Sequence, residues 1–218
     1  MQAAIFDMDG VLVDNNQYHK KSWLLFLESF GYHLTDEQLN QHVYGKINED
    51  ILNYVFPEPL DDQRIRELSY QKEELYREIY QEHIEAPPGL VNLLEALQSK
   101  MPLGIATSAP PQNLDFVLDT LHIRQFFSTL VHGEMVKQGK PHPEIYLKAA
   151  HQLNVEPQGC VVFEDSLAGI ESAQHAGMKV VAITSTYPAD QLNHADQVIA
   201  TFGQFEMELL NPEPQLNS

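Results

Sequence analysis

Short apolar runs recur along the chain and predict the strands of a sheet. They are residues 3–7, "PLGIATS" at 102–108, "TLVHG" at 129–133, "CVVFED" at 160–165, "KVVAIT" at 179–184 and a weaker run, "QVIA", at 197–200. A continuous apolar run of this length, bounded by polar residues, is typical of a buried strand. We therefore expect a sheet whose strands are covered on both faces.

The segments between these runs show the spacing of amphipathic helices. One apolar stripe comprises Leu90, Leu93, Leu94 and Leu97, and a second comprises Leu114, Val117, Leu118 and Leu121. Strands that alternate with helices favour a mainly parallel sheet with helices on both faces. The predicted fold class is therefore α/β, with a Rossmann-like core.

One long interval breaks this alternation, because residues 17–86 contain no convincing strand and have helical spacing instead. Its apolar residues Trp23, Phe26, Leu27 and Phe30 fall on one helical face, with Trp23 and Phe26 expected in a core. Thr35, followed three residues later by Gln38, predicts a capped helix start. We predict a discontinuous core of residues 1–15 and 87–218, interrupted after the first strand by a helical cap domain of residues 16–86.

Composition and charge narrow the class of partner. The 218 residues are 43% hydrophobic, which is enough for one sizeable domain or for a core with an insertion. The formal net charge is −18, from 31 acidic and 13 basic residues. Nucleic acids and anionic membranes both bind basic surfaces, so neither is expected as a partner.

The apolar runs and the cysteine count indicate the cellular compartment of the protein. No run approaches the ~20 apolar residues of a membrane span, and the N-terminus lacks the features of a signal peptide. Cys160 is the single cysteine, so an internal disulfide is excluded and a reducing compartment is favoured. We expect a cytoplasmic monomer in which Cys160 is buried and inert.

Polar residues follow the predicted strands at the points where each strand ends. They are Asp7 and Asp9, then Thr107 and Ser108, then Lys140 ahead of a helix, and then Glu164 and Asp165. Ligands of open parallel sheets bind outside the carboxyl ends of the strands. Side chains alternate along a strand, so the carboxylates of Asp7 and Asp9 point the same way and repel each other. A divalent cation bound between the two carboxylates would offset this repulsion.

Taken singly, each of these residues also has an ordinary structural explanation. Paired aspartates can cap a loop, and Thr107 or Asp165 can begin a helix. A lysine in a loop, such as Lys140, is usually solvated. The signal comes from the combination and from its order along the chain.

That combination resembles the haloacid dehalogenase superfamily, and within it the β-phosphoglucomutase-like branch of phosphatases and mutases. The similarity runs through "FDMDGVLVD", "GKPHPEIYLKAA" and "FEDSLAGIESAQHAG". The helical insertion also lies where that branch carries its cap. The resemblance implies a haloacid dehalogenase-like fold for the core.

The resemblance also implies a role for each strand-end residue. Asp7 would be the nucleophile that forms an aspartyl-phosphate, and Asp9 the general acid and then base. Mg²⁺ would be bound by the Asp7 side chain, the Asp9 backbone carbonyl and Asp165, with Glu164 orienting a metal-bound water from behind. Thr107 and the Ser108 N–H would hold phosphoryl oxygens, and Lys140 would offset their charge.

Further candidates lie in the predicted cap and would contact the substrate. They are His19, Gly45, Lys46, Asn48 and Lys72. For His19 the alternative is a surface or capping histidine, and for Lys72 it is a solvated lysine. In the mutase, an arginine grips the distal phosphate at the position of Asn48, and an asparagine cannot replace a bidentate guanidinium. Lys46 is nearby as a substitute.

The sequence therefore favours a Mg²⁺-dependent phosphatase that acts on a small phosphorylated metabolite, such as a sugar phosphate. The resemblance also disfavours dehalogenation. The dehalogenating branch has no acid at the position of Asp9, because a halide leaving group needs no proton, whereas this sequence has an aspartate there. The alternatives are a phosphohexomutase, which shares every core residue, an inorganic pyrophosphatase, and a binding module without catalysis.

Overall fold

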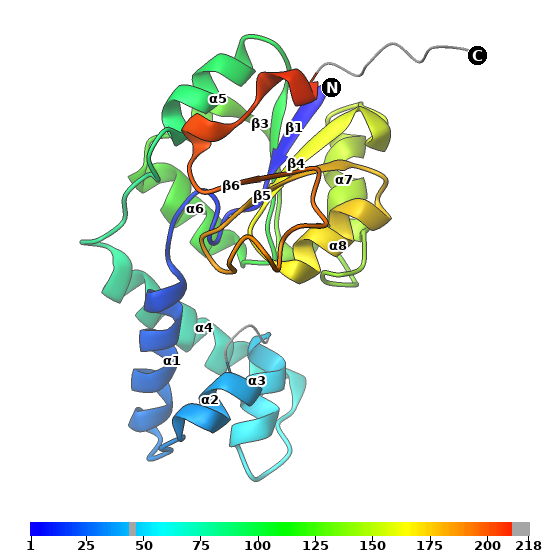
Figure 1. Cartoon of the computed structure of the whole chain (residues 1–218). Helices are drawn as coiled ribbons and strands as arrows, with labels where there is room; N and C mark the ends of the chain where they lie inside the picture. Colours follow the sequence, from blue (N-terminus) through cyan, green and yellow to red (C-terminus); the bar gives the residue numbers. More distant parts are fainter. Residues whose placement is uncertain (44–46, 211–218) are drawn as a thin grey trace. The chain divides into compact units, whose positions relative to one another are not determined.

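The computed structural model describes residues 1–43 and 47–210 (Figure 1). The chain forms two compact units, one made of the residues up to Asp14 and from Ile84 onward, the other of Asn15–His83. The boundaries expected from the sequence, after residues 15 and 86, lie close to those of the two units. That the helical unit serves as a cap domain stays a proposal.

The first unit contains a sheet that, within the described residues, has six strands in the order β3-β2-β1-β4-β5-β6. The strands are β1 (Ala3–Phe6), β2 (Leu103–Ala106), β3 (Phe127–Val131), β4 (Cys160–Glu164), β5 (Lys179–Ile183) and β6 (Gln197–Ile199). All neighbouring strands pair in parallel, which confirms the predicted α/β sheet. β3 begins earlier than the predicted run, because Phe127 already pairs with Leu103 before a register shift.

Helices cover both faces of this sheet (Figure 1). They are α5 (Leu90–Gln98), α6 (Pro111–Thr120), α7 (Glu144–Gln152) and α8 (Leu167–His175), with α5 and α6 on the side opposite α7 and α8. Ile145 of α7 and Ile170 of α8 share one core with Ile5 of β1. Side chains alternate along a strand, so Phe6 lies on the other face, where its ring stacks on Phe163 at 4.5 Å.

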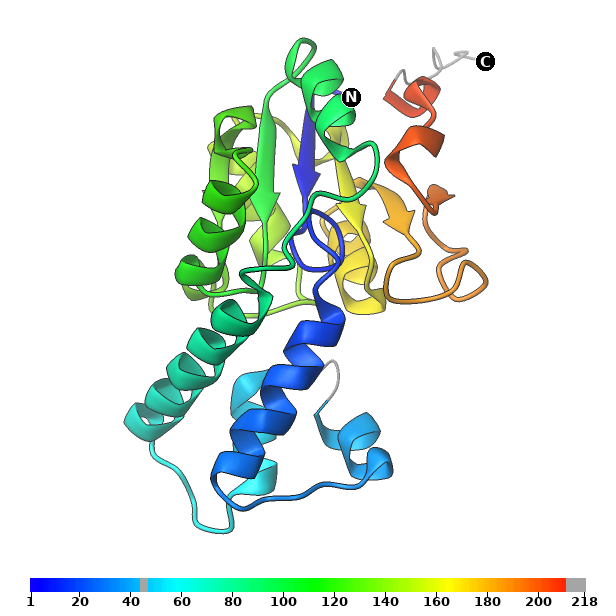
Figure 2. The ribbon, with the colours of Figure 1, turned by 90° about the vertical axis from the view of Figure 1, so that its left-hand side faces the viewer.

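The strand order creates a topological switch point at one edge of the sheet. β1 lies between β2 and β4, so the chain first builds the sheet on one side of β1 and later returns to the other side. Figure 2 shows the arrowheads of the strands pointing to the same edge. The register pairs Phe6 with Phe163, and the Asp7 N–H donates to the Phe163 carbonyl at 2.9 Å. Residues that follow β1 and β4 are therefore brought together at this switch point.

The second unit is helical in its described residues. Its helices are α1 (Asn16–Ser29), α2 (Asp36–His42), α3 (Asn48–Val55) and α4 (Asp62–Tyr80). Trp23 and Phe26 are buried in its core, as predicted, whereas Phe30 follows the end of α1 and is 38% exposed. Thr35 and Gln38 form the predicted capping box. No helix in the described parts of the two units is both long enough and apolar enough to cross a membrane.

Candidate active site

Three buried carboxylates meet at the switch point of the sheet. Asp7 directly follows β1, Glu164 is the last residue of β4 and Asp165 comes next. One oxygen from each lies within 4.8 Å of the others. Their approach follows from the parallel register of β1 and β4 and could not arise from either segment alone.

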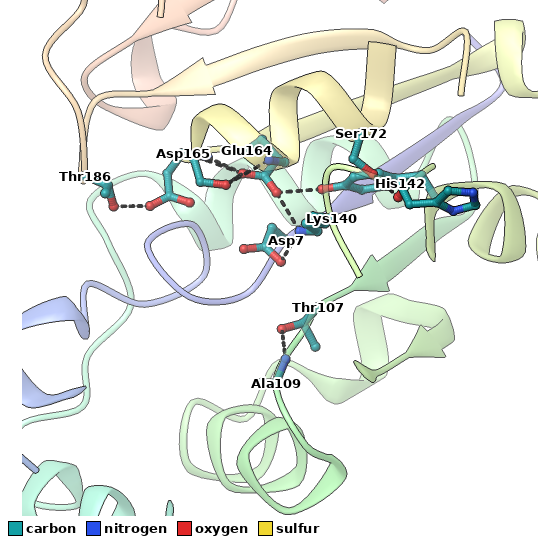
Figure 3. Close-up of polar contacts among 12 residues, drawn as sticks. Asp7, Thr107, Ala109, Lys140, His142, Glu164, Asp165, Ser172 and Thr186 are labelled. Carbon is teal, nitrogen blue, oxygen red and sulfur yellow. Dashed lines mark hydrogen bonds and ion pairs between the residues drawn. The ribbon is translucent and has the colours of Figure 1, made fainter. Parts of the chain in front are cut away.

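Lys140 joins two of these carboxylates, as Figure 3 shows. Its Nζ lies 2.8 Å from Asp7 Oδ1 and 2.5 Å from Glu164 Oε1, and its side chain is 8% exposed. The structure therefore excludes a solvated Lys140. Because a lone buried ammonium is costly, the two carboxylates are what stabilise it there.

The loop that carries Lys140 is held on both sides. The backbone N–H groups of Lys137 and Gln138 donate to the Glu144 carboxylate at 3.1 and 3.0 Å. Ser172 Oγ on α8 donates to the His142 carbonyl at 2.8 Å (Figure 3). These contacts fix the backbone before and after Lys140, so the Lys140 ammonium has a defined position.

Donors surround both oxygens of Glu164. Oε1 accepts from Lys140 and from the Tyr146 hydroxyl at 2.8 Å, while Oε2 accepts from the Asp165 and Ser166 N–H groups and from Ser166 Oγ at 2.8, 2.9 and 3.0 Å. A Cβ at Gly169 would lie 1.7 Å from Oε1. A carboxylate with this many partners is fixed in place and well compensated despite its burial.

Asp165 is held from the segment that follows β5. The Thr186 hydroxyl donates to Asp165 Oδ2 (Figure 3), and Ser185 Oγ donates to the Gly10 carbonyl at 2.5 Å. Gly10 has φ +77°, and a Cβ there would lie 1.9 Å from Asp165 Oδ2. Only glycine allows the turn after β1 to pass this close to the carboxylate.

Burial and like charges set the ionisation of these groups. Burial raises the pKa of Asp7 to about 7 although Lys140 opposes it, and Glu164 adds to the rise. Burial beside Glu164 and Asp7 also raises the pKa of Asp165 well above its ordinary value. For Glu164 burial acts in the same direction, but Lys140 and the hydrogen bonds outweigh it and lower the pKa.

This balance tests whether a metal ion fits the site. Lys140 keeps its proton, because Asp7 and Glu164 raise its pKa well above normal in spite of burial. One ammonium among three clustered carboxylates leaves negative charge that burial makes unfavourable. Clustered carboxylate oxygens are the hard donors that Mg²⁺ prefers, so the donor set fits this ion.

The predicted phosphate-binding residues follow β2. Thr107 is 1% exposed, its N–H donates to the Val131 carbonyl at 3.0 Å, and its Oγ1 accepts from the Ala109 N–H at 3.1 Å. Because the hydroxyl oxygen already accepts one bond, its hydrogen is oriented away from Ala109 and can be donated to a ligand. Ser108 is exposed, and Asp9 is half-buried in the turn that contains Gly10.

Comparison with known proteins decides the family. The family model described as haloacid dehalogenase-like hydrolase matches residues 4–183. The chain belongs to this family. The resemblance identified from the sequence motifs is thereby confirmed.

Other members of the haloacid dehalogenase-like family are similar along most of this chain. A phosphorylated carbohydrates phosphatase of Thermotoga maritima is 34% identical over 82% of this chain and 83% of its own length. A chloroplastic 5-amino-6-(5-phospho-D-ribitylamino)uracil phosphatase of Arabidopsis thaliana is 32% identical over 90% of this chain, which spans only 53% of that relative. The β-phosphoglucomutase of Bacillus subtilis is 29% identical over 98% of this chain and 95% of its own.

A solved structure of this family has the same fold. The haloacid dehalogenase hydrolase of family IA, variant 3, from Entamoeba histolytica has a TM-score of 0.89 and 28% sequence identity. The match covers 96% of this chain and 97% of the other. The sheet order described above, including the switch point between β1 and β4, is thus the fold of this family.

In the helical unit of this family member, three of the predicted residues meet at Glu73. Lys72 Nζ lies 2.7 Å from Glu73 Oε1 and 3.0 Å from His19 Nδ1, and Asn48 Nδ2 donates to Glu73 Oε1 at 2.9 Å. Lys72 is 1% exposed, so it is buried and not solvated. The other two predicted residues, Gly45 and Lys46, lie outside the described residues.

Charge compensation also governs this second cluster. Burial opposes ionisation of Glu73, but Lys72 and His19 outweigh it and lower its pKa to about 2. The His19 ring stacks on Tyr76 at 3.8 Å, and Lys72 Nζ lies 5.1 Å from the Trp23 ring centroid. The positive charge of Lys72 is thus largely matched inside the helical unit itself.

Sequence reasoning missed several polar residues that the structure brings into the two clusters. They are Tyr146, Ser185, Thr186 and Glu73. The strand-end rule could have found Ser185 and Thr186, because they follow β5 beside β4. Tyr146 could not be found this way, since its position fits the apolar stripe of α7 and only the fold places Glu164 against its hydroxyl.

Proposed function

We propose that this protein is a Mg²⁺-dependent phosphatase that hydrolyses a small phosphorylated metabolite, in the first instance a sugar phosphate, through an aspartyl-phosphate on Asp7. The observation that carries the proposal is the position of Lys140, shared between Asp7 and Glu164 beside Asp165 at the switch point of the sheet. The phosphatase relatives described above support the same reaction class.

In the first half of the proposed reaction, a carboxylate oxygen of Asp7 attacks phosphorus. A bond forms between this oxygen and phosphorus, and the bond from phosphorus to the substrate oxygen breaks. Asp9 donates its proton to the leaving oxygen as general acid, so an alcohol departs. Lys140, 2.8 Å from Asp7 Oδ1, reduces the repulsion between the nucleophile and the phosphate dianion.

In the second half, water attacks the phosphorus of the aspartyl-phosphate. Asp9, now ionised, accepts a proton from this water as general base, and the Asp7 carboxylate leaves as inorganic phosphate forms. The Thr107 hydroxyl and the Ser108 N–H donate to phosphoryl oxygens in both halves. The Ala109 N–H, bound to Thr107 Oγ1 at 3.1 Å, orients that hydroxyl.

The residues that would hold Mg²⁺ are Asp7, the Asp9 backbone carbonyl and Asp165. When bound, Mg²⁺ offsets the charge between the attacking carboxylate and the phosphate. Glu164 belongs to the same cluster, but its oxygens are already engaged by Lys140, Tyr146 and the donors that follow β4. We assign it to anchoring Lys140 and to orienting water from behind the ligands.

The contacts of Asn48 support a phosphatase over a phosphohexomutase. Asn48 stands where the mutase branch has an arginine for a second phosphate, and its amide donates to Glu73. Glu73 also binds the Lys72 ammonium, so the Asn48 amide and the Lys72 ammonium are both engaged by the same carboxylate. A substrate with one phosphate and a neutral remainder fits this arrangement better than a sugar bisphosphate.

Phosphate release from a panel of compounds tests the proposal. The panel comprises sugar monophosphates, nucleotides and pyrophosphate, each with Mg²⁺ and with chelator, alongside the Asp7→Asn variant and an Asp62→Asn control at an exposed aspartate. We expect Mg²⁺-dependent turnover of sugar monophosphates that Asp7→Asn abolishes and Asp62→Asn retains. Mass spectrometry of an Asp9→Ala variant after brief exposure to 4-nitrophenyl phosphate, whose leaving group needs no general acid, should show phosphate on Asp7 because hydrolysis lacks its base.

The other reactions have distinct outcomes in the same experiment. Isomerisation of β-glucose 1-phosphate, when a trace of the bisphosphate is present and without net phosphate release, would favour the mutase. Turnover confined to pyrophosphate would favour the pyrophosphatase. No turnover of any compound, with ligand binding retained, would favour a binding module and contradict the proposal.

A further inference from the structure

The Tyr146 hydroxyl and ring both contact the pair formed by Lys140 and Glu164. Tyr146 Oη donates to Glu164 Oε1 at 2.8 Å, and Lys140 Nζ lies 4.9 Å from the centroid of the Tyr146 ring. Tyr146 is fully buried, with 0% exposure. One side chain therefore touches the anionic and the cationic partner of the same ion pair.

From this geometry we infer that Tyr146 is a positioning residue that sets how Lys140 divides its charge between Glu164 and Asp7. The inference rests on the proposed function and extends it to a residue that does not touch the substrate. It follows from the contact between the Tyr146 hydroxyl and the carboxylate oxygen that also binds Lys140.

The physical reason is competition for one oxygen. Glu164 Oε1 accepts from both Tyr146 and Lys140, so the phenol O–H satisfies part of the negative charge that faces the ammonium. Lys140 is then held less tightly by Glu164 and acts more strongly on Asp7, 2.8 Å away. Without the hydroxyl, Glu164 Oε1 depends on Lys140, and the ammonium shifts toward it.

The position of Tyr146 makes this coupling rigid. It lies in the first turn of α7, and the preceding residues of that turn include Glu144, whose carboxylate holds the loop of Lys140. The same helix therefore fixes the backbone that leads to Lys140 and the ring beneath its ammonium. The aromatic face also favours the cation there, independently of the hydroxyl.

Two substitutions separate the hydroxyl from the ring. Tyr146→Phe removes only the hydroxyl, Tyr146→Leu removes both, and Tyr80→Phe removes the hydroxyl of a similarly buried tyrosine in the helical unit. The steady-state kcat and KM are measured with 4-nitrophenyl phosphate and Mg²⁺. We expect Tyr146→Phe to lower kcat roughly 3- to 10-fold with KM within about 2-fold, Tyr146→Leu to lower it further, and Tyr80→Phe to leave it unchanged.

A second measurement does not depend on activity. The ¹⁵N signal of the Lys140 ammonium, assigned by its loss in Lys140→Met, should shift in Tyr146→Phe and stay in place in Tyr80→Phe. An unchanged Lys140 signal in Tyr146→Phe would overturn the inference whatever happens to kcat, and so would an unchanged kcat in an active enzyme. If the wild-type protein hydrolyses no phosphate ester, the proposed function fails separately, and the Lys140 signal still decides the role of Tyr146.

Discussion

The carboxylate of Asp7 and the ammonium of Lys140 lie 2.8 Å apart, although 133 residues separate them along the chain. Asp7 follows the central strand β1, whereas Lys140 comes from the loop that leads back across the sheet toward β4. The contact therefore depends on the pairing of β1, β2 and β3, because Asp7 follows β1 and Lys140 follows β3. It also makes Lys140 a sensitive position for both stability and activity.

Substitution of Lys140 by methionine should impair both properties. The change leaves Asp7 and Glu164 buried without their shared cation, so we expect the free energy of unfolding to fall by roughly 3–5 kcal/mol. Turnover of 4-nitrophenyl phosphate should fall by a factor on the order of 10² or more, because positive charge beside the phosphate is lost. Urea unfolding and steady-state kinetics measure the two effects.

Lys100→Met, at an exposed lysine, is the control for Lys140→Met. It should retain the unfolding free energy and the kcat of the wild-type protein. Wild-type turnover in Lys140→Met would show that the ammonium at this site has no part in the chemistry.

The stability of the protein in chelator should fall as pH rises through the titration of Asp7. Its pKa is raised from 3.8 to about 7, so between these values the folded state binds more protons than the unfolded state. Proton binding by Asp7 therefore stabilises the folded state fully below pH 3.8, and this stabilisation is lost as the pH rises to about 7. Unfolding free energies across this window in Asp7→Asn should show a shallower decline.

Mg²⁺ should reverse this trend, because the proposed site would bind it through ionised carboxylates. We expect the rise in melting temperature caused by Mg²⁺ to be small at pH 5 and larger at pH 7.5, and to vanish in Asp165→Asn. A Mg²⁺ effect of equal size at both pH values would show that the ion binds outside this cluster.

Gly10→Ala should disrupt the carboxylate cluster through a direct clash with Asp165, in addition to straining the backbone. A Cβ at Gly10 would lie 1.9 Å from Asp165 Oδ2, so the carboxylate or the turn must move. We expect loss of the Mg²⁺-dependent rise in melting temperature and of phosphatase activity. Calorimetry with and without Mg²⁺ measures the first effect.

Gly31→Ala is the matched control for this change. Gly31 has nearly the same backbone angle, φ +78° against +77° at Gly10, but a Cβ there meets nothing within 4 Å. It should cost about 1 kcal/mol of stability from strain and leave the Mg²⁺ response intact. Equal loss of the Mg²⁺ response in both variants would remove the argument from close approach.

The buried pair of Lys72 and Glu73 yields a prediction for the helical unit. Lys72→Met leaves Glu73 buried without its cation and should lower the free energy of unfolding by roughly 3–5 kcal/mol. The double change Lys72→Met with Glu73→Met removes both charges and should recover most of that loss. Urea unfolding of the wild-type protein and the two variants measures the difference.

The pH dependence of this pair has the opposite sign to that of Asp7. The pKa of Glu73 falls from 4.5 to about 2, so its contribution is present above pH 4.5 and is lost as pH falls toward 2. The double variant should lack this component of acid unfolding. If Lys72→Met were as stable as the double variant, the loss in Lys72→Met would not come from an unpaired buried carboxylate.

The sequence was sufficient for the sheet, the helical insertion and the strand-end residues. Continuous apolar runs predict buried strands, and an apolar spacing of three to four residues predicts helices. Both patterns reflect local geometry, so they can be read without knowledge of the fold. The parallel sheet then implies that Asp7, Thr107 and Asp165 gather at one edge, because carboxyl ends of parallel strands share an edge. Motif order was enough to identify the family.

Only the tertiary structure decided which side chains form ion pairs and hydrogen bonds with one another. The sequence alone could not tell that Lys140 bridges Asp7 and Glu164, that Tyr146 donates to the same oxygen as Lys140, or that Lys72 is matched by Glu73. The reason is that burial and charge pairing depend on side chains far apart in sequence, whose distances the packed fold sets. Which carboxylates keep their protons, and which cations are compensated, follows from those distances.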